Sequence, residues 1–193
     1  MLKNGEEIKK TLDNGGVITF VTDTVWGLGC IPDREDAVKK IYDIKKREAQ
    51  KPLILMSSDI EYLKPYVKSF SDKAQGLVDR FFPGALTLVL EKSEKTPDYI
   101  TSGFNTVGIR VPDNIIFKEI CELAKDKVLA TTSANLSHEP SAKTYSQAVK
   151  NMKDKADLII EDYGFEAQGL ESTVVLIKDE EIKVLRQGAI KLP

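Results

Sequence analysis

The stretch Val17-Ile18-Thr19-Phe20-Val21-Thr22-Asp23-Thr24 joins a short apolar run to three polar residues. The β-branched and aromatic side chains of its first half are typical of a buried strand. In open α/β sheets, ligands bind in the loops that follow the strands. The pattern therefore predicts a strand over residues 17–21 and a candidate pocket wall immediately after it.

Along the rest of the chain, predicted strands alternate with predicted helices at first and pair locally near the end. Helical periodicity covers residues 3–13, 34–47, 59–67, 71–81, 113–125 and 144–152, with Asp33, Ser71 and Asp113 as candidate N-caps. Strand-like runs cover residues 52–56, 85–90, 106–111, 128–132, 158–160, 172–177 and 182–185. This order favours an α/β domain with one mixed sheet.

Composition excludes several classes of protein. The chain has 193 residues, 41% hydrophobic and 30% charged, which predicts a single domain over residues 1–193. Its apolar runs are too short to cross a bilayer and its N-terminus lacks a secretion-signal core, so a cytoplasmic protein is expected. A formal charge of −2 is not typical of a nucleic-acid binder. Two cysteines and one histidine, His138, exclude a disulfide framework and histidine-rich metal sites.

Small hydroxyl side chains gather in loops beside predicted strands. Thr22 and Thr24 follow the strand over residues 17–21, Thr131 to Ser137 ends another strand, and Ser172 begins a third. Hydroxyl and amide groups contact phosphate, ribose or base edges without adding a competing anion. The alternative is a set of turns closed by side-chain hydrogen bonds. The chain has neither a GxxxxGK[ST] nor a GxGxxG motif, so a nucleotide site here would be non-standard.

Four basic residues also stand out. If the chain is extended after the helix over residues 34–47, Lys45 and Arg47 point to one side and suit a polyphosphate. The alternative is a solvated helix C-terminus, where cations complement the helix dipole. Arg110 interrupts a strand and either faces solvent or pairs with a carboxylate in a pocket. Arg186 ends the last predicted strand.

Seven segments together resemble the YrdC-like family of L-threonylcarbamoyladenylate synthases. They include Thr22-Asp23-Thr24-Val25-Trp26-Gly27-Leu28-Gly29 and Leu185-Arg186-Gln187-Gly188, and they cover residues 22–29, 45–53, 82–89, 106–112, 132–137, 169–175 and 185–188. They occur in the family's order, and the length is similar to its short, single-domain form. The resemblance implies a twisted mixed sheet flanked by helices, with a concave, positively lined face.

The resemblance also implies an activity. Such enzymes combine L-threonine, bicarbonate and ATP, with Mg²⁺, into threonylcarbamoyl-AMP and pyrophosphate. Transfer proteins then deliver the threonylcarbamoyl group to an adenosine of certain tRNAs, and tRNA itself is a further potential partner. Mg²⁺ would be held through the ATP phosphates, without a protein metal site.

Residue roles follow from the matching positions. Lys45 and Arg47 would be catalytic, by stabilising charge on the phosphates. ATP contacts would fall on Lys45, Arg47, Lys51, Thr106, Ser133, Asn135, Ser141 and Arg186. Threonine contacts would fall on Thr24, Arg110, Thr131 and Ser172.

The chain departs from the family pattern at several of these segments. Met56 stands where some members have a threonine-contacting His, and Lys51, Trp26, Gln187 and His138 replace the more usual Asn, Tyr, Pro and Gly. Two other functions stay open from sequence: a non-catalytic RNA-binding module that uses the same basic face, and a carbamoyl-transfer domain of the kind built into hydrogenase-maturation proteins.

Overall fold

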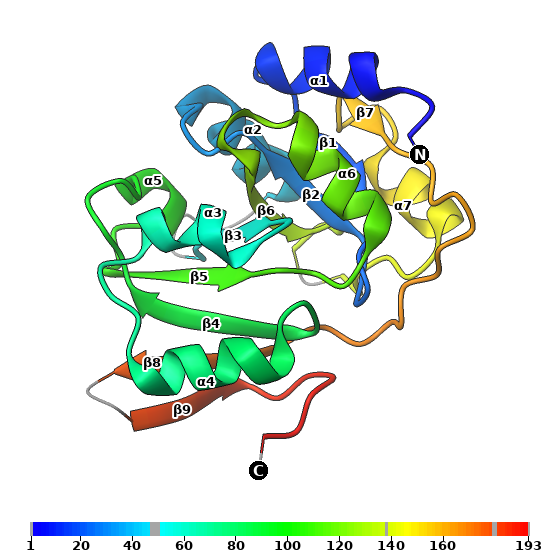
Figure 1. Ribbon diagram of the computed structural model, residues 1–193. Coiled ribbons are helices and arrows are strands. Elements are labelled where there is room, and N and C mark those ends of the chain that lie inside the picture. The colour runs from blue at the N-terminus through cyan, green and yellow to red at the C-terminus, as the bar shows by residue number, and fades with distance from the viewer. Residues whose placement is uncertain (1, 47–50, 138, 179–180, 193) are drawn as a thin grey trace.

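The computed structural model describes residues 2–46, 51–137, 139–178 and 181–192 (Figure 1). Its helices are α1 (Gly5–Asp13), α2 (Glu35–Lys45), α3 (Ile60–Leu63), α4 (Asp72–Phe81), α5 (Asp98–Thr101), α6 (Ile115–Leu123) and α7 (Tyr145–Met152), with 3₁₀ turns η1 (Lys64–Tyr66) and η2 (Lys125–Lys127). Its strands are β1 (Ile18–Phe20), β2 (Gly27–Cys30), β3 (Ile54–Ser57), β4 (Leu86–Glu91), β5 (Thr106–Arg110), β6 (Val128–Ser133), β7 (Leu158–Ile159), β8 (Thr173–Lys178) and β9 (Glu181–Arg186).

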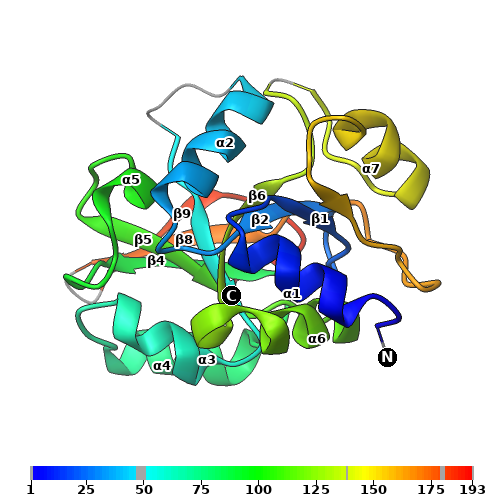
Figure 2. The same ribbon diagram turned by 90° about the horizontal axis from the view of Figure 1, so that it is seen from above.

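All the described strands form one sheet, in the order β7-β1-β2-β6-β3-β5-β4-β8-β9. The pairs β1/β7, β3/β5 and β4/β8 are parallel and the remaining pairs are antiparallel, which confirms the predicted mixed sheet. Figure 2 shows α1, α3, α4 and α6 on one side of the sheet and α2 and α7 on the other. This arrangement is an α/β fold with helices flanking a single sheet.

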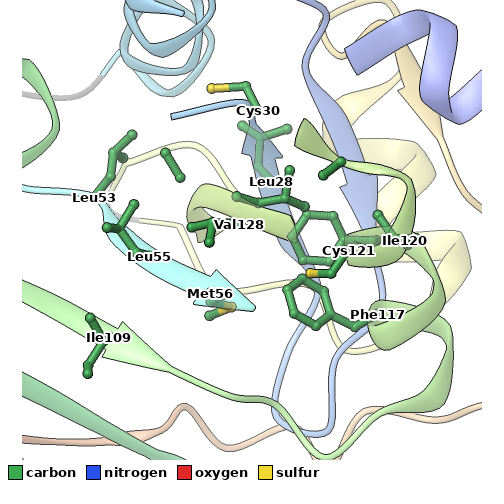
Figure 3. Packing of buried hydrophobic residues seen from close by; sticks show 14 of the residues in the cluster. Leu28, Cys30, Leu53, Leu55, Met56, Ile109, Phe117, Ile120, Cys121 and Val128 are labelled. Atoms are coloured by element: carbon green, nitrogen blue, oxygen red, sulfur yellow. The ribbon is translucent and has the colours of Figure 1, made fainter. Parts of the chain in front are cut away.

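The hydrophobic core lies between the sheet and these helices. Figure 3 shows part of it, where Leu28, Leu55 and Val128 come from the neighbouring strands β2, β3 and β6, and Phe117 comes from α6. All four side chains are fully buried. Phe20 of β1 stacks at a tilt on Phe117 with ring centroids 5.1 Å apart, so aromatic packing also fixes α6 against the sheet.

Cross-strand register places the polar strand residues on one face of the sheet. Ile54 lies opposite both Thr131 of β6 and Gly108 of β5, and Met56 lies opposite Arg110. Because side chains alternate along a strand and paired residues share a face, these positions project together. Their neighbours Leu55 and Ile109 project to the other face and are fully buried. Leu55 and Ile109 therefore face the hydrophobic core, whereas Thr131 and Arg110 face the opposite side of the sheet.

The structure corrects several predicted boundaries. Residues 27–30 form strand β2, although the sequence pattern indicated a loop, and α5 had no helical signal in its four residues. The N-cap position of α2 is Arg34, without a side-chain cap, so the cap predicted at Asp33 is wrong. Lys45 is the last residue of α2 and is not extended, and Lys46 follows it in the left-handed conformation. The Ser71 cap of α4 is confirmed, because its side chain accepts from Ala74 N.

Helix α6 begins at Ile115, two residues after the predicted start, and is capped by Asn114, not by Asp113. The Asn114 side chain is nearly buried and accepts a hydrogen bond from Phe117 N at 2.9 Å.

Loss of such a cap costs about 1 kcal/mol. We therefore expect Asn114→Ala to lower the free energy of unfolding by about 1 kcal/mol in urea denaturation. The matched control is Asp113→Ala, which removes an exposed side chain and should change stability by under about 0.5 kcal/mol; equal losses would contradict the assignment.

Candidate ligand-binding site

A cavity of about 490 Å³ opens on the polar face of the sheet. It is lined by residues from β2, β3, β4, β5, β6, β8 and β9 and from the loops beside them: Thr22, Thr24, Val25, Trp26, Gly27, Lys51, Pro52, Ile54, Met56, Thr87, Phe104, Arg110, Thr131, Thr132, Ser133, Glu171, Ser172, Val174 and Arg186. The size suits a small organic ligand. The lining combines cations, hydroxyls and an apolar floor, as ligand pockets do.

Arg110 is the most buried cation on the wall of this cavity, with a side chain that is 2% exposed. Its Nε donates to Gly84 O at 2.9 Å and its Nη1 to Thr24 Oγ1 at 2.8 Å, and its Nη2 forms an ion pair with Asp23 Oδ1 at 2.5 Å. Burial lowers the pKa of Arg110 from its ordinary value, while the Asp23 carboxylate raises it. These bonds occupy three of the five guanidinium N–H groups, which leaves donors for a ligand anion.

The loop after β1 brings two threonine hydroxyls to the same place. Thr22 Oγ1 donates to Val25 O at 2.6 Å and lies 3.1 Å from Thr24 Oγ1. Backbone N–H groups of Gln168 and Gly169 donate to Asp23 O and Thr24 O and bind the loop to the segment before β8. The sequence alternative of a turn closed by threonine hydrogen bonds is therefore also correct, since the same residues make the turn and line the cavity.

A second cluster joins the start of β8 to the end of β9. Arg186 Nη2 donates to Ser172 O at 2.9 Å and Ser172 Oγ at 3.2 Å, and Arg186 Nη1 forms an ion pair with Glu171. The other Glu171 oxygen accepts from Ser141 Oγ at 2.8 Å. Ser172 Oγ also lies 2.8 Å from Thr87 Oγ1 of β4. Ser141 therefore reaches the site through Glu171 and is not itself part of the lining.

The end of α2 is bound to the loop after β6. Lys45 is 2% exposed, and its Nζ donates to Ser133 O at 2.6 Å, Asn135 O at 2.8 Å and Asn135 Oδ1 at 3.0 Å. Ser133 Oγ donates to Asn135 Oδ1 at 2.5 Å. Thr131 lies two residues before Ser133 on β6, and its Oγ1 donates to Ile54 O at 3.1 Å. Lys45 and Asn135 thus lie behind the cavity wall that Ser133 and Thr131 form.

Most residues predicted for the site come together in this cavity. Lys51, Ser133 and Arg186 of the predicted ATP set line it, as do all four residues of the predicted threonine set. Lys45, Asn135 and Ser141 contact its lining residues, whereas Thr106 is half-buried at the start of β5 and outside the lining. Arg47 and His138 lie outside the described residues.

Sequence reasoning missed several residues of the site. Asp23 and Glu171 lie within segments that resemble the family, but the sequence pattern predicted no role for them. In the structure each pairs with an arginine that was predicted for the site. A carboxylate beside a proposed anion site was the available signal, because a buried arginine needs a partner. Thr87, Val174 and Phe104 gave no signal, since only strand register and turn geometry bring them to the cavity.

Both cysteines of the chain are buried in the structure. Cys30 and Cys121 are free and buried, and burial raises the pKa of both thiols, which makes them poor nucleophiles. Over the part of the chain that the structure describes, no group of three or more His, Cys, Asp or Glu side chains could hold a metal ion. No helix among these residues is long and apolar enough to cross a membrane.

The protein has an α/β fold, and its cavity presents two arginines and several hydroxyl side chains, a lining that suits an anionic small molecule. The family model Sua5_yciO_yrdC, described as "Telomere recombination", matches residues 10–188. The chain belongs to the Sua5/YciO/YrdC family.

Curated relatives support this membership. The chain is 38% identical over 178 residues to a threonylcarbamoyl-AMP synthase of Pyrococcus abyssi, covering 92% of this chain and 52% of that protein. It is 31% identical over 189 residues to a threonylcarbamoyl-AMP synthase of Vibrio parahaemolyticus, covering 97% of this chain and 100% of that protein. The chain therefore spans about half the length of the first relative and the whole length of the second.

Solved structures give the same fold. P. abyssi Sua5 complexed with L-threonine superposes with a TM-score of 0.89 at 36% identity, covering 95% of this chain and 54% of that one. Escherichia coli YciO superposes with a TM-score of 0.85 at 24% identity, covering 95% of this chain and 90% of that one. The expected twisted mixed sheet flanked by helices is confirmed.

The ion pair between Asp23 and Arg110 yields a stability prediction. Both side chains are over nine-tenths buried, so Asp23→Ala leaves an uncompensated charge, which costs about 3–5 kcal/mol in buried pairs. Arg110 lines the cavity and keeps its bonds to Gly84 O and Thr24 Oγ1, so we expect the lower end, about 3 kcal/mol, in urea denaturation. The control is Asp33→Ala, which removes an exposed pair with Lys125 and should cost under about 1 kcal/mol. Equal losses from the two variants would contradict the role of burial.

Proposed function

We propose that this protein is an L-threonylcarbamoyladenylate synthase, which forms threonylcarbamoyl-AMP and pyrophosphate from L-threonine, bicarbonate and ATP. The observation that carries the proposal is the cavity in which Arg110, Thr24, Thr131 and Ser172 meet Lys51, Ser133 and Arg186. One group suits an amino acid and the other a nucleotide. Two curated relatives, which match 92% and 97% of this chain, carry this activity in their names.

The proposed chemistry needs positioning and charge more than a nucleophile. The threonine amine adds to bicarbonate, with loss of water, and gives a carbamate. A carbamate oxygen then attacks the α-phosphorus of ATP, and pyrophosphate leaves. Such transfers are catalysed mainly by alignment of the reactants and by stabilisation of charge on the phosphoryl oxygens. A site without an activated serine or cysteine fits this reaction.

The amino acid would bind at the Arg110 end of the cavity. The remaining N–H groups of Arg110 would bind its carboxylate, and the hydroxyls of Thr24, Thr131 and Ser172 would contact its polar groups. Ile54, Met56 and Val174 supply apolar surface in the same cavity for a side-chain methyl group. One methyl group is worth about 1–3 kcal/mol of discrimination, which sets the scale of selectivity for threonine over serine.

The nucleotide would bind along the other wall. Lys51 and Arg186 line the cavity and would contact phosphate oxygens, with Lys45 and Arg47 as the proposed catalytic cations. Ser133, Asn135, Ser141 and Thr106 complete the proposed ATP set. The carboxylates at the site, Asp23 and Glu171, are both paired with arginines, so Mg²⁺ would enter as part of the MgATP substrate, bound through the phosphates.

The wider context of the reaction is part of the same proposal. Residues 1–193 would act as one catalytic domain, in the cytoplasm, where ATP and tRNA are present. A threonylcarbamoyl adenylate is a mixed anhydride that water hydrolyses, so the product would pass to a transfer protein that modifies tRNA. The buried hydroxyl network around Thr24 would limit water at the reacting end before transfer.

Pyrophosphate release tests the proposal directly. The protein, incubated with MgATP, bicarbonate and L-threonine, should release pyrophosphate, and omission of threonine should abolish the release. Chromatography should recover threonylcarbamoyl-AMP in equal amount. Absence of threonine-dependent release would contradict the synthase, and salt-sensitive RNA binding without ATP turnover would point to an RNA-binding module instead.

Single substitutions test the phosphate contacts. Lys51→Ala removes an exposed cation from the cavity wall and should raise the KM for ATP by about tenfold, because a charged hydrogen bond is worth about 1.5–3 kcal/mol. The KM for threonine should stay within about twofold, because Lys51 is proposed to contact ATP and not threonine. Lys39→Ala in α2, exposed and outside the cavity, is the matched control.

A separate pair of variants, Lys45→Ala and Arg47→Ala, tests the proposed catalytic cations, and full activity in both would contradict that role.

A further inference from the structure

Two buried hydroxyl groups of the cavity wall contact each other directly. Thr87 Oγ1 of β4 lies 2.8 Å from Ser172 Oγ, and the two residues are 0% and 4% exposed. Ser172 Oγ also accepts a hydrogen bond from Arg186 Nη2 at 3.2 Å. Within the described part of the chain, the Thr87 hydroxyl bonds to Ser172 alone. Thr87 therefore acts on the contents of the cavity through Ser172.

Strand register places this pair of hydroxyls between the two arginines of the cavity. Thr87 lies opposite Val174 of β8, and Val174 lies opposite Arg186 of β9. On the other side of β4, its antiparallel register with β5, carried one residue further, sets Thr87 opposite Arg110. Figure 1 shows β4 between β5 and β8. Because neighbouring strands lie about 4.8 Å apart, Thr87 is one strand away from Arg110 and two strands away from Arg186.

A count of hydroxyl hydrogens indicates the direction of the bond. If Ser172 donated to Thr87, the Thr87 hydrogen would be fully buried with no acceptor among the described residues, which is unfavourable. If Thr87 donates, Ser172 Oγ accepts from both Thr87 and Arg186, which fills its two lone pairs. The hydrogen of Ser172 is then left for a group in the cavity. Ser172 is therefore a donor toward a ligand and not an acceptor.

We propose that Thr87 is a positioning residue that fixes the Ser172 hydroxyl as a hydrogen-bond donor to the carbamate group of the bound substrate. This rests on the proposed function, in which the amino-acid carboxylate binds Arg110 and phosphate binds Arg186. The carbamate of threonine lies between its carboxylate and the α-phosphate, as the hydroxyl pair lies between the two arginines. Carbamate oxygens are anionic and accept hydrogen bonds, so a hydroxyl fixed as a donor suits them.

The contact should appear in kcat more than in the KM for threonine, because the carbamate forms only after threonine and bicarbonate have bound. Thr87→Val removes the hydroxyl and keeps the shape of the side chain. It should lower kcat about fivefold, within the range of one neutral hydrogen bond, and change the KM for threonine by under about twofold. Thr87→Ser keeps the hydroxyl and should hold kcat within about twofold.

A double-mutant cycle distinguishes positioning from an independent effect. Because Thr87 acts through Ser172, Thr87→Val in a Ser172→Ala background should change kcat by under about 1.5-fold, against about fivefold in the otherwise unsubstituted protein. Equal losses of kcat in the two backgrounds would overturn the proposal. A Thr87→Ser variant as slow as Thr87→Val would also overturn it, because the methyl group and not the hydroxyl would then matter.

Thr19→Val in β1 is the matched control. It makes the same exchange at a fully buried strand threonine that is outside the cavity lining and whose hydroxyl has no hydrogen-bond partner among the described residues. Its kcat and KM values should equal those of the unsubstituted protein. Circular dichroism and the thermal midpoint show whether each variant is folded. If Thr87→Val is not, Thr87→Ala removes the same hydroxyl and takes its place in the cycle.

The outcomes separate this inference from the proposed function. Threonine-dependent pyrophosphate release by the unsubstituted protein supports the synthase, and additive effects of the two substitutions then overturn the role of Thr87 alone. If the unsubstituted protein shows no such release, both proposals fall.

Discussion

A buried guanidinium fixes the geometry of the cavity. Arg110 binds Asp23 and Thr24 in the loop after β1 and Gly84 in the loop before β4, so one side chain joins three segments distant in sequence. A buried charge is tolerated only when its partners are in place, so loss of any of these contacts has a large cost. Arg110 also lines the cavity. The contacts of Arg110 that stabilise this part of the fold therefore also hold a cation in position for an anionic ligand.

The sheet brings the other groups to that cation through close backbone packing. A side chain at Gly27 would place its Cβ 2.5 Å from Cε2 of Phe20, a contact that real side chains do not make. The absence of a side chain lets Phe20 cover β2 and lets β2 pair closely with β6, opposite Ser133. Gly27 therefore serves packing on β2. On its other side β6 pairs with β3, so Thr131 lies opposite Ile54 and both line the cavity.

Sequence predicted the parts of this arrangement that depend on local pattern. Apolar runs and helical stripes located most helices and strands, and the polar residues after strands marked Thr24, Thr131 and Ser172. β2 was missed because its Gly-Leu-Gly-Cys sequence has little strand propensity, and pairing with β1 and β6 on both sides supplies its stability. The α6 cap was misplaced by one residue because Asp113 and Asn114 are both good caps by composition. Cross-strand neighbours such as Thr87 and Val174 depend on register, which a single sequence does not encode locally.

The two arginines of the cavity differ in how firmly their carboxylate partners are held. Arg110 and Asp23 are 2% and 8% exposed, whereas Arg186 and Glu171 are 45% and 38% exposed. A buried pair is strongly coupled, but an exposed pair contributes about 0–1 kcal/mol, so Glu171 is displaced at low cost. On the proposed function, a phosphate oxygen would therefore replace Glu171 on Arg186 more easily than a ligand carboxylate would replace Asp23 on Arg110. Arg110 would keep its partner and bind the ligand through its remaining donors, while Arg186 would exchange one anion for another. The two arginines would then act as a fixed and an exchangeable anion-binding group. Each of the two arginines in the cavity lining is paired with its own carboxylate, in a chain whose formal charge is −2.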